Sequence, residues 1–263
     1  MSAGIFRDGP LLRITLNRPD KRNALTDEMT AEMIAAVQGA GTDEAVRAIL
    51  LTAEGEHFCS GYDIVARNAA KTESKPRAGS IQRRLPTQAH QLIPVLCETQ
   101  VPVVAAIRGW AAGIGLALAL AADFTVASET ATFWAPYTGR GFTPDSGLSW
   151  LLPRRVGEVR ARRMLLLGEK IKGTEAADWG LIHACVPDDS LDDESERIAA
   201  TLSGQATVAV GLAKWLMHAG REAPLEATLR NEAFAMELSS RSEDFREGMK
   251  AFAARRDPKF TGR

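Results

Sequence analysis

The sequence predicts an α/β domain over residues 1–190, followed by a helical region over residues 191–263. The main observation is the stretch from Pro102 to Asp123, where a short run rich in β-branched residues leads through a glycine turn into a run rich in alanine and leucine. That order is typical of a buried strand followed by a buried helix. Elsewhere strand-like and helical segments alternate, and beyond Ser190 the pattern is helical to about Ala254. Such alternation with a helical tail predicts an α/β domain with an α-helical appendage.

The elements before this stretch are predicted from the alternation of apolar and polar residues, from helix-capping residues and from the positions of glycines. The run LLRITLN after Gly9 and Pro10 alternates as a strand does, so it forms the second half of a hairpin. Thr26 is suited to cap a helix, because Asp27 and Glu28 follow in its first turn. The expected elements, in order, are a hairpin over residues 5–17, a helix from Thr26, a strand over 46–52, a loop over 53–63, a polar mobile loop over 65–84 and a helix over 87–98.

The elements after the stretch are expected to be shorter. Gly180 ends one helix as a C-cap glycine does, and Pro224 begins a helix of the C-terminal region. The expected elements, in order, are strands over residues 124–127 and 130–134, a loop over 137–146, helices over 147–152, 158–167 and 174–179, and a strand over 181–186.

Composition places the chain among soluble cytoplasmic proteins. Of the 263 residues, 45% are hydrophobic and 25% charged, and the net charge of −1 favours neither nucleic acid nor a membrane surface as a partner. The three cysteines are far apart and odd in number, which predicts reduced thiols, and the N-terminus shows no signal peptide. The apolar run over residues 109–122 is shorter than the roughly 20 residues that span a bilayer, so we expect a core helix. The four histidines show no metal-ligand spacing, so no metal is expected.

The start of the central helix is the first candidate for chemistry. Gly113 and Gly115 are small enough for a ligand to approach the backbone. The N–H groups of a first helical turn lack partners within the helix, and the helix dipole places partial positive charge there. An oxygen that gains negative charge during a reaction is stabilised at such a place. A dinucleotide fingerprint is excluded, because Leu118 occupies the position of its third glycine.

Four motifs resemble the enoyl-CoA hydratase/isomerase (crotonase) family. They occur in the family's order across nearly the whole chain: NRPDKRNAL at residues 17–25, FCSGYDI at 58–64, GWAAGIG at 109–115 and ADWGLI at 177–182. The resemblance implies a spiral of ββα repeats with a C-terminal α-helical trimerisation region. It also implies homotrimers or homohexamers and acyl-CoA thioester substrates. Coenzyme A is then part of the substrate, and no cofactor is bound permanently.

The resemblance also implies an oxyanion hole made of two main-chain N–H groups. Carried over by motif, these are the N–H groups of Tyr62 and Ile114. Two fixed donors at the thioester oxygen lower the barrier to enolate formation, by roughly 2.7–4 kcal/mol per donor in measured cases.

The departures from the family pattern decide which reaction is expected. Family hydratases carry glutamates at the positions that here hold Ala117 and Tyr137, so simple hydration is not favoured. Asp145, in the segment FTPDSG, stands where family isomerases carry a catalytic aspartate, and TPDSGLSWLLPR resembles the phenylacetate-pathway isomerase branch. One carboxylate suffices to shuttle a proton in a double-bond shift. The alternative for Asp145 is a helix N-cap, since a helix follows it.

Two other hypotheses remain open. The first is an enoyl-CoA hydratase or an aryl-CoA or acyl-CoA hydrolase, with water held by Asp145 and His90. His90 with Asp145, and an aromatic residue at Tyr137, resemble the aryl-CoA dehalogenase branch, where an aspartate attacks the ring and water then hydrolyses the ester. A non-catalytic acyl-CoA binder is the second alternative.

The resemblance implies further contacts with the substrate. The residues expected to contact coenzyme A are Arg22, Ala24 and Ser60, and also Lys259 and Phe260, which in the family often reach the site from a neighbouring subunit. The residues suited to line an acyl pocket for rings or long chains are Trp110, Trp134, Tyr137 and Phe142.

Overall fold

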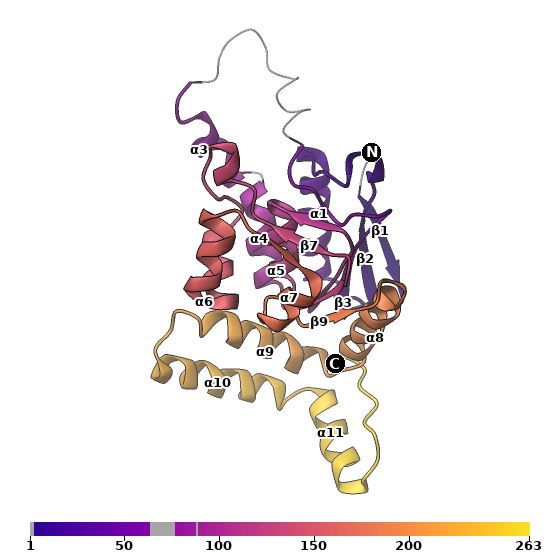
Figure 1. Ribbon diagram of the computed structural model, residues 1–263. Coiled ribbons are helices and arrows are strands. Elements are labelled where there is room, and N and C mark those ends of the chain that lie inside the picture. The colour runs from indigo at the N-terminus through magenta and orange to yellow at the C-terminus, as the bar shows by residue number, and fades with distance from the viewer. Residues whose placement is uncertain (1–2, 64–76, 88) are drawn as a thin grey trace.

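The computed structural model describes residues 3–63, 77–87 and 89–263 (Figure 1). Most of the loop expected over residues 65–84 lies outside the described residues. Its last part corrects the expectation, because Ser80–Arg84 forms a short helix, α3. Arg83 and Arg84 occupy the last turn of α3, where the helix dipole favours positive charge.

The larger of two sheets has six strands in the order β1-β2-β3-β4-β6-β9. Its strands are β1 (Gly4–Asp8), β2 (Leu11–Leu16), β3 (Ala48–Ala53), β4 (Val103–Ile107), β6 (Phe124–Ser128) and β9 (Ala184–Val186). The predicted hairpin is confirmed, since β1 and β2 pair antiparallel, and each later pairing is parallel. Because parallel strands end at one edge, the loops after β3 and β4 emerge on the same side of the sheet.

A second sheet has three short strands in the order β5-β7-β8. They are β5 (Trp110–Ala112), β7 (Thr132–Trp134) and β8 (Lys170–Lys172). β5 was expected to be part of a helix, and β8 was not foreseen. Strands of three residues carry almost no periodicity, and their pairing partners lie far away in the sequence. The succession of β4, β5 and a helix, followed by β6, β7 and a helix, gives consecutive ββα units whose two strands join different sheets.

The helices of the α/β part pack around these sheets. They are α1 (Asp27–Ala40), α4 (Ala89–Glu98), α5 (Ile114–Ala121), α6 (Leu148–Leu166) and α7 (Gly173–Asp178), with short 3-10 turns η1 (Pro19–Lys21), η2 (Leu85–Thr87), η3 (Thr138–Arg140) and η4 (Asp188–Ser190). The predicted cap is confirmed, because the Thr26 hydroxyl accepts a hydrogen bond from the Met29 N–H. Every residue of α5 is buried, as predicted for a core helix. Gly157, with a φ of 73°, interrupts α6 between the two helices that were expected there.

The C-terminal region begins with α8 (Leu191–Ser203), which packs on the larger sheet through Ala199 against Leu50 and Val104. The following helices, α9 (Thr207–Ala219), α10 (Leu225–Ser239) and α11 (Glu243–Ala254), form an arm (Figure 1). α9 lies against the α/β part, since Lys214 on it donates to the Val101 carbonyl at 3.1 Å, and α10 and α11 extend beyond it. Within the described part of the chain, no helix is long and apolar enough to cross a membrane.

Candidate active site

Two loops that follow neighbouring strands lie side by side. Cys59, in the loop after β3, donates through its N–H to the Trp110 carbonyl at 2.8 Å and accepts from the Ala112 N–H at 2.9 Å. A Cβ atom on Gly115 would lie 2.5 Å from the Cys59 carbonyl oxygen, so only glycine permits this approach. Backbone hydrogen bonds and the small size of Gly115 therefore hold the two glycine-containing loops together.

The turns that precede the two expected donors meet at this junction. Gly61 has a φ of 117° and Gly113 a φ of 57°, conformations that side chains rarely adopt. A Cβ atom on Gly113 would lie 3.8 Å from the Gly61 Cα atom, so the residues before Tyr62 and Ile114 are neighbours. Ile114 is the first residue of α5, where N–H groups have no acceptor within the helix. The two predicted donors are thus brought close together.

A third segment holds the first loop from the other side. The Leu25 N–H donates to the Gly61 carbonyl at 2.9 Å, and the Asp63 N–H donates to the Leu25 carbonyl at 2.9 Å. The Tyr62 hydroxyl donates to the Asp27 carboxylate in the first turn of α1. These contacts fix the backbone on both sides of Tyr62.

Asp145 lies in the loop before α6, and its carboxylate is turned toward two hydroxyl groups. Asp145 Oδ1 accepts from the Tyr137 hydroxyl at 2.9 Å and from the Ser146 hydroxyl at 2.9 Å. The N-cap residue of α6 is Gly147, so the alternative of Asp145 as a side-chain cap is wrong. Only the Asp145 carbonyl oxygen serves the helix, accepting from the Leu148 N–H at 3.2 Å.

Tyr137 connects Asp145 with the turn before Ile114. Its hydroxyl lies 3.7 Å from the position of a Cβ atom on Gly113. The side chain is only 3% exposed, and this burial, with the neighbouring Asp145 carboxylate, raises the pKa of the hydroxyl. The structure therefore places the predicted carboxylate, its hydroxyl partner and the turn before Ile114 in one cluster.

The two positions where hydratases carry glutamates are both buried and carry no carboxylate. Ala117 is fully buried in α5, and Tyr137 contacts the Phe142 ring edge to face at 5.5 Å. The other two aromatic residues expected in an acyl pocket lie on neighbouring strands beside the two loops, since the Trp134 carbonyl accepts from the Gly113 N–H at 3.0 Å. Trp110 and Trp134 contact each other at 5.8 Å on the small sheet, with the Lys170 ammonium over both rings.

His90 lies on α4, one turn before Ile93, and the Ile93 side chain lies 3.7 Å from the Cβ position of Gly147. This contact places α4 beside the loop that carries Asp145. Among the described residues His90 Nε2 is buried without a hydrogen-bond partner, so it makes no hydrogen bond with Asp145.

The residues expected to contact coenzyme A fall into two groups. The Ser60 N–H donates to the Arg22 carbonyl at 3.0 Å, and Ala24 adjoins Leu25, so these residues lie beside the loop that carries Tyr62. Phe260 lies elsewhere, because its carbonyl accepts from Arg47, which precedes β3, at 3.3 Å. The loop that carries Tyr62 follows the other end of β3, a strand of six residues or about 20 Å. Within one chain Lys259 and Phe260 are therefore remote from Tyr62 and Asp145.

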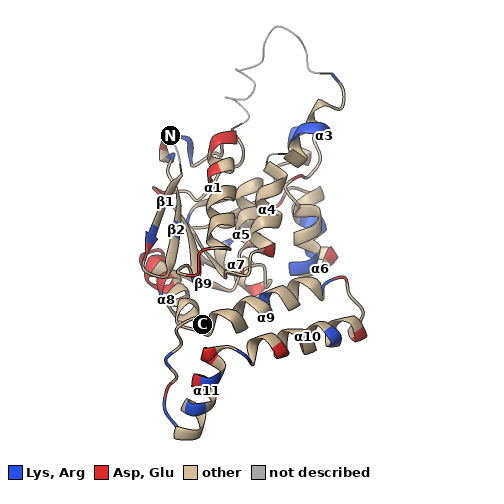
Figure 2. Cartoon of the chain, turned by 180° about the vertical axis from the view of Figure 1, so that it is seen from behind, with Lys and Arg blue, Asp and Glu red and all other residues tan. Residues whose placement is uncertain are grey.

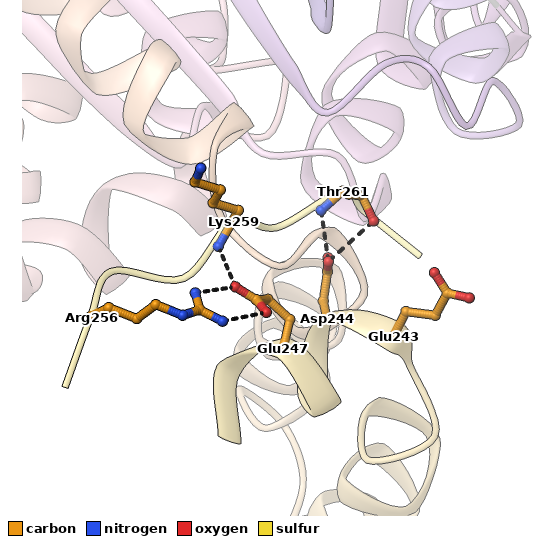
Figure 3. A pocket seen from close by; sticks show the side chains of 6 residues that line it. All are labelled: Glu243, Asp244, Glu247, Arg256, Lys259 and Thr261. Carbon is orange, nitrogen blue, oxygen red and sulfur yellow. Dashed lines mark hydrogen bonds and ion pairs between the residues drawn. The ribbon is translucent and has the colours of Figure 1, made fainter. Parts of the chain in front are cut away.

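The C-terminal segment is held against α11, where the two border a hollow of about 400 Å³ (Figure 3). Asp244 accepts from the N–H groups of Thr261 and Gly262 at 2.7 and 2.8 Å. Glu247 pairs with Arg256 and accepts from the Lys259 N–H at 2.9 Å. The Lys259 ammonium extends away from Glu247 (Figure 3). Asp244 and Glu247 therefore hold the backbone of the C-terminal segment and do not pair with the Lys259 ammonium.

Three other features bear on the chemistry of the protein: possible metal ligands, the cysteine next to the site and the surface charge. Across residues 3–63, 77–87 and 89–263, no three His, Cys, Asp or Glu side chains gather as metal ligands do. Burial raises the pKa of the Cys59 thiol to about 12, so it stays protonated and is a poor nucleophile. Both acidic and basic residues lie along α10 and α11 (Figure 2), in keeping with the balanced charge of the sequence.

Sequence reasoning missed two residues of the cluster. Ser146 directly follows Asp145, and its φ of 54° turns its hydroxyl back onto the carboxylate. Asp27 was assigned only to the first turn of a helix, and its contact with Tyr62 depends on the tertiary fold. No local sequence pattern predicts the contact of Ser146 with Asp145 or that of Asp27 with Tyr62.

Comparison with known proteins agrees with this geometry. Residues 7–263 match the family model described as enoyl-CoA hydratase/isomerase. The chain is 36% identical over 253 residues to the 1,2-epoxyphenylacetyl-CoA isomerase of Escherichia coli, covering 96% of this chain and 95% of the relative. It is 40% identical over 250 residues to a Rhodobacter capsulatus protein named "Probable enoyl-CoA hydratase", covering 95% and 94%.

A solved structure confirms the predicted fold. The enoyl-CoA hydratase of Polaromonas sp. JS666 superposes with a TM-score of 0.91 at 31% identity, over 99% of this chain and 100% of that one. The sheets, the glycine turns and these comparisons lead to one conclusion: the chain belongs to the enoyl-CoA hydratase/isomerase, or crotonase, family.

Proposed function

We propose that the protein isomerises the double bond of an enoyl-CoA thioester, with Asp145 as the group that removes and returns the proton. One observation carries the proposal. The Asp145 carboxylate is turned toward the Tyr137 hydroxyl, which lies beside Gly113, instead of capping the helix that follows. A base is thus close to the turns where a thioester oxygen would be held.

The proposed reaction begins when Asp145 takes a proton from the carbon beside the thioester. The electrons move onto the thioester oxygen, and the N–H groups of Tyr62 and Ile114 stabilise the charge. The proton returns to the carbon two positions further along the chain, which moves the double bond into conjugation. Coenzyme A enters as part of the substrate and leaves as part of the product.

Hydration is the main competitor, since relatives carry both hydratase and isomerase names. A hydratase needs to hold and activate water. Ala117 supplies no acid or base, and Tyr137 is engaged with Asp145, so a single carboxylate is present where two are expected. This difference favours isomerisation.

The decisive experiment compares Asp145→Asn with Asp193→Asn, which alters an exposed aspartate on α8. With a 3-enoyl-CoA in D₂O, the unmodified protein and the Asp193 variant should exchange the proton at C2 and shift the double bond. Asp145→Asn should stay folded and bind the thioester but do neither. Equal exchange by both variants would refute the assignment, as would rapid hydration of crotonyl-CoA by the unmodified protein.

A second candidate function is hydrolysis of an aryl-CoA, for which His90 is the supporting observation. Its unpartnered Nε2 on α4, in the helix beside the Asp145 loop, is suited to orient water. Release of halide from a haloaryl-CoA that is lost in His90→Gln would favour this function. A protein that binds thioesters but neither exchanges, hydrates nor hydrolyses them would be a non-catalytic binder.

We also propose that copies assemble as a homotrimer or homohexamer in the cytoplasm. The arm exposes large apolar side chains that a partner would cover: Met217, Leu225, Phe234 and Phe252 are each more than 70% exposed. Light scattering should give a multiple of 28.4 kDa, and a stable monomer would contradict the assembly.

A further inference from the structure

The Tyr137 hydroxyl occupies a position between the base and the oxyanion turn. It donates to Asp145 Oδ1 at 2.9 Å and lies 3.7 Å from the Cβ position of Gly113. A phenylalanine would fill the same space against Phe142. The hydroxyl is therefore not needed for packing, and its role lies in its hydrogen bond to Asp145.

The hydroxyl keeps its proton across the physiological pH range. Burial and the Asp145 carboxylate both raise the pKa of Tyr137, so the phenolate is not formed at rest. In the resting state the site thus holds one carboxylate that can accept a proton and one phenol that can deliver one, in direct hydrogen-bond contact.

We infer that Tyr137 is a second catalytic residue, which delivers to the substrate a proton different from the one that Asp145 removes. This inference rests on the proposed isomerase function. It keeps Asp145 as the group that removes the proton and replaces the second step of the proposal above, because Tyr137 and not Asp145 then returns a proton to the substrate.

Each step balances. The C2–H bond breaks, an O–H bond forms on Asp145, and the electron pair moves to the thioester oxygen. The phenol O–H bond of Tyr137 then breaks as a C4–H bond forms and the electrons return from the oxygen. Asp145 gives its proton to the Tyr137 oxygen, 2.9 Å from its own, and both groups regain their starting states.

The relay makes a prediction about isotopes that a single shuttling carboxylate does not. The phenol proton equilibrates with solvent between turnovers, so the hydrogen that reaches C4 comes from water. With one carboxylate, part of the hydrogen taken from C2 is returned to C4 in the same turnover.

The experiment uses a 3-enoyl-CoA with deuterium at both C2 positions, in H₂O, in a single turnover with enzyme in excess. The unmodified protein should place almost no deuterium at C4. Tyr137→Phe should raise the deuterium at C4 at least fivefold and slow turnover by about 10²-fold, the loss typical of a general acid. Ser146→Ala is the matched control, because it also removes one hydroxyl from Asp145 Oδ1 but should leave the C4 label as low as in the unmodified protein.

Equal C4 labelling in the unmodified protein and Tyr137→Phe, whether high or low, would overturn the relay. Transfer of C2 deuterium to C4 by the unmodified protein would overturn it even if the variant failed to fold. The underlying proposal fails separately: if the unmodified protein does not exchange the C2 label at all, or if Asp145→Asn exchanges it equally, Asp145 is not the base.

Discussion

Arg18 and Asp63 form an ion pair of 3.0 Å whose side chains are only 14% and 13% exposed. Arg18 also donates to the Ala24 carbonyl at 2.6 Å. One guanidinium therefore joins the segment expected to contact coenzyme A with the residue that follows Tyr62. The pair fixes the loop that carries Tyr62 relative to the segment around Ala24.

Arg18→Gln should destabilise the fold and reduce turnover. Removing one partner of a largely buried pair costs about 3 kcal/mol, and a donor displaced by 1 Å can cost about 10²-fold in kcat. Urea unfolding and steady-state kinetics measure the two effects. Arg7→Gln is the control, because its pair with Asp43 is half exposed, and it should change stability by less than about 1 kcal/mol. Equal effects of both substitutions would contradict a special role for Arg18.

Gly115→Ala should separate the two loops of the site. The added Cβ would lie 2.5 Å from the Cys59 carbonyl oxygen and 2.7 Å from the Cys59 Cβ, so the backbone must move. We expect a stability loss of roughly 1–3 kcal/mol from overpacking and a lower kcat. Gly39→Ala, in α1 with open space around it, should instead stabilise by about 0.5–1 kcal/mol. Thermal unfolding of both variants tests the pair, and a Gly115→Ala protein as stable and active as the unmodified one would refute the close approach.

The sequence predicted the elements whose own residues determine them. Thr26, with the acidic residues of the first turn after it, predicts α1, and the continuous apolar run before Asp123 predicts α5. β5 and β8 were not predicted because a strand of three residues is defined by its pairing partners, which here lie about 20 to 40 residues away in the sequence. The same limit applies to the site. Motifs located Tyr62, Ile114 and Asp145, whereas the Tyr137–Asp145 contact depends on how the loop over residues 137–146 folds back on itself.

The attachment of the C-terminal segment should depend on acid pH. Hydrogen bonds from Arg256 and from the Lys259 amide lower the pKa of Glu247 from an ordinary 4.5 to about 2. Since the folded pKa is depressed, the contribution of Glu247 is complete above pH about 4.5 and is lost as the pH falls toward 2. Hydrogen exchange at the Lys259 amide should accelerate over that window beyond its intrinsic pH dependence. Glu247→Gln should remove the extra acceleration, and an unchanged profile in this variant would refute the role of Glu247.

The separation of Lys259 from Asp145 leads to the final prediction. Arg47 holds the C-terminal segment at the start of β3, and the loop that carries Tyr62 follows the end of the same strand. If Lys259 contacts the phosphates of coenzyme A, it must do so in the site of another copy. Lys259→Ala should then raise KM for thioesters severalfold and leave kcat nearly unchanged, because the lost interaction is equally present in ground and transition states.

Mixing two defective proteins tests whether the contact is made between copies. Asp145→Asn subunits have an intact tail but an inactive site, and Lys259→Ala subunits have an intact site but a defective tail. In mixed oligomers reassembled from denaturant, some sites combine Asp145 of one chain with Lys259 of another, so a fraction of the activity should recover the low KM of the unmodified protein. Contact within one chain gives no such sites, because each intact Asp145 then carries its own defective tail. Mixed oligomers with only the high KM would therefore show that Lys259 acts within its own chain or at no substrate site, and the separation along β3 favours the opposite result.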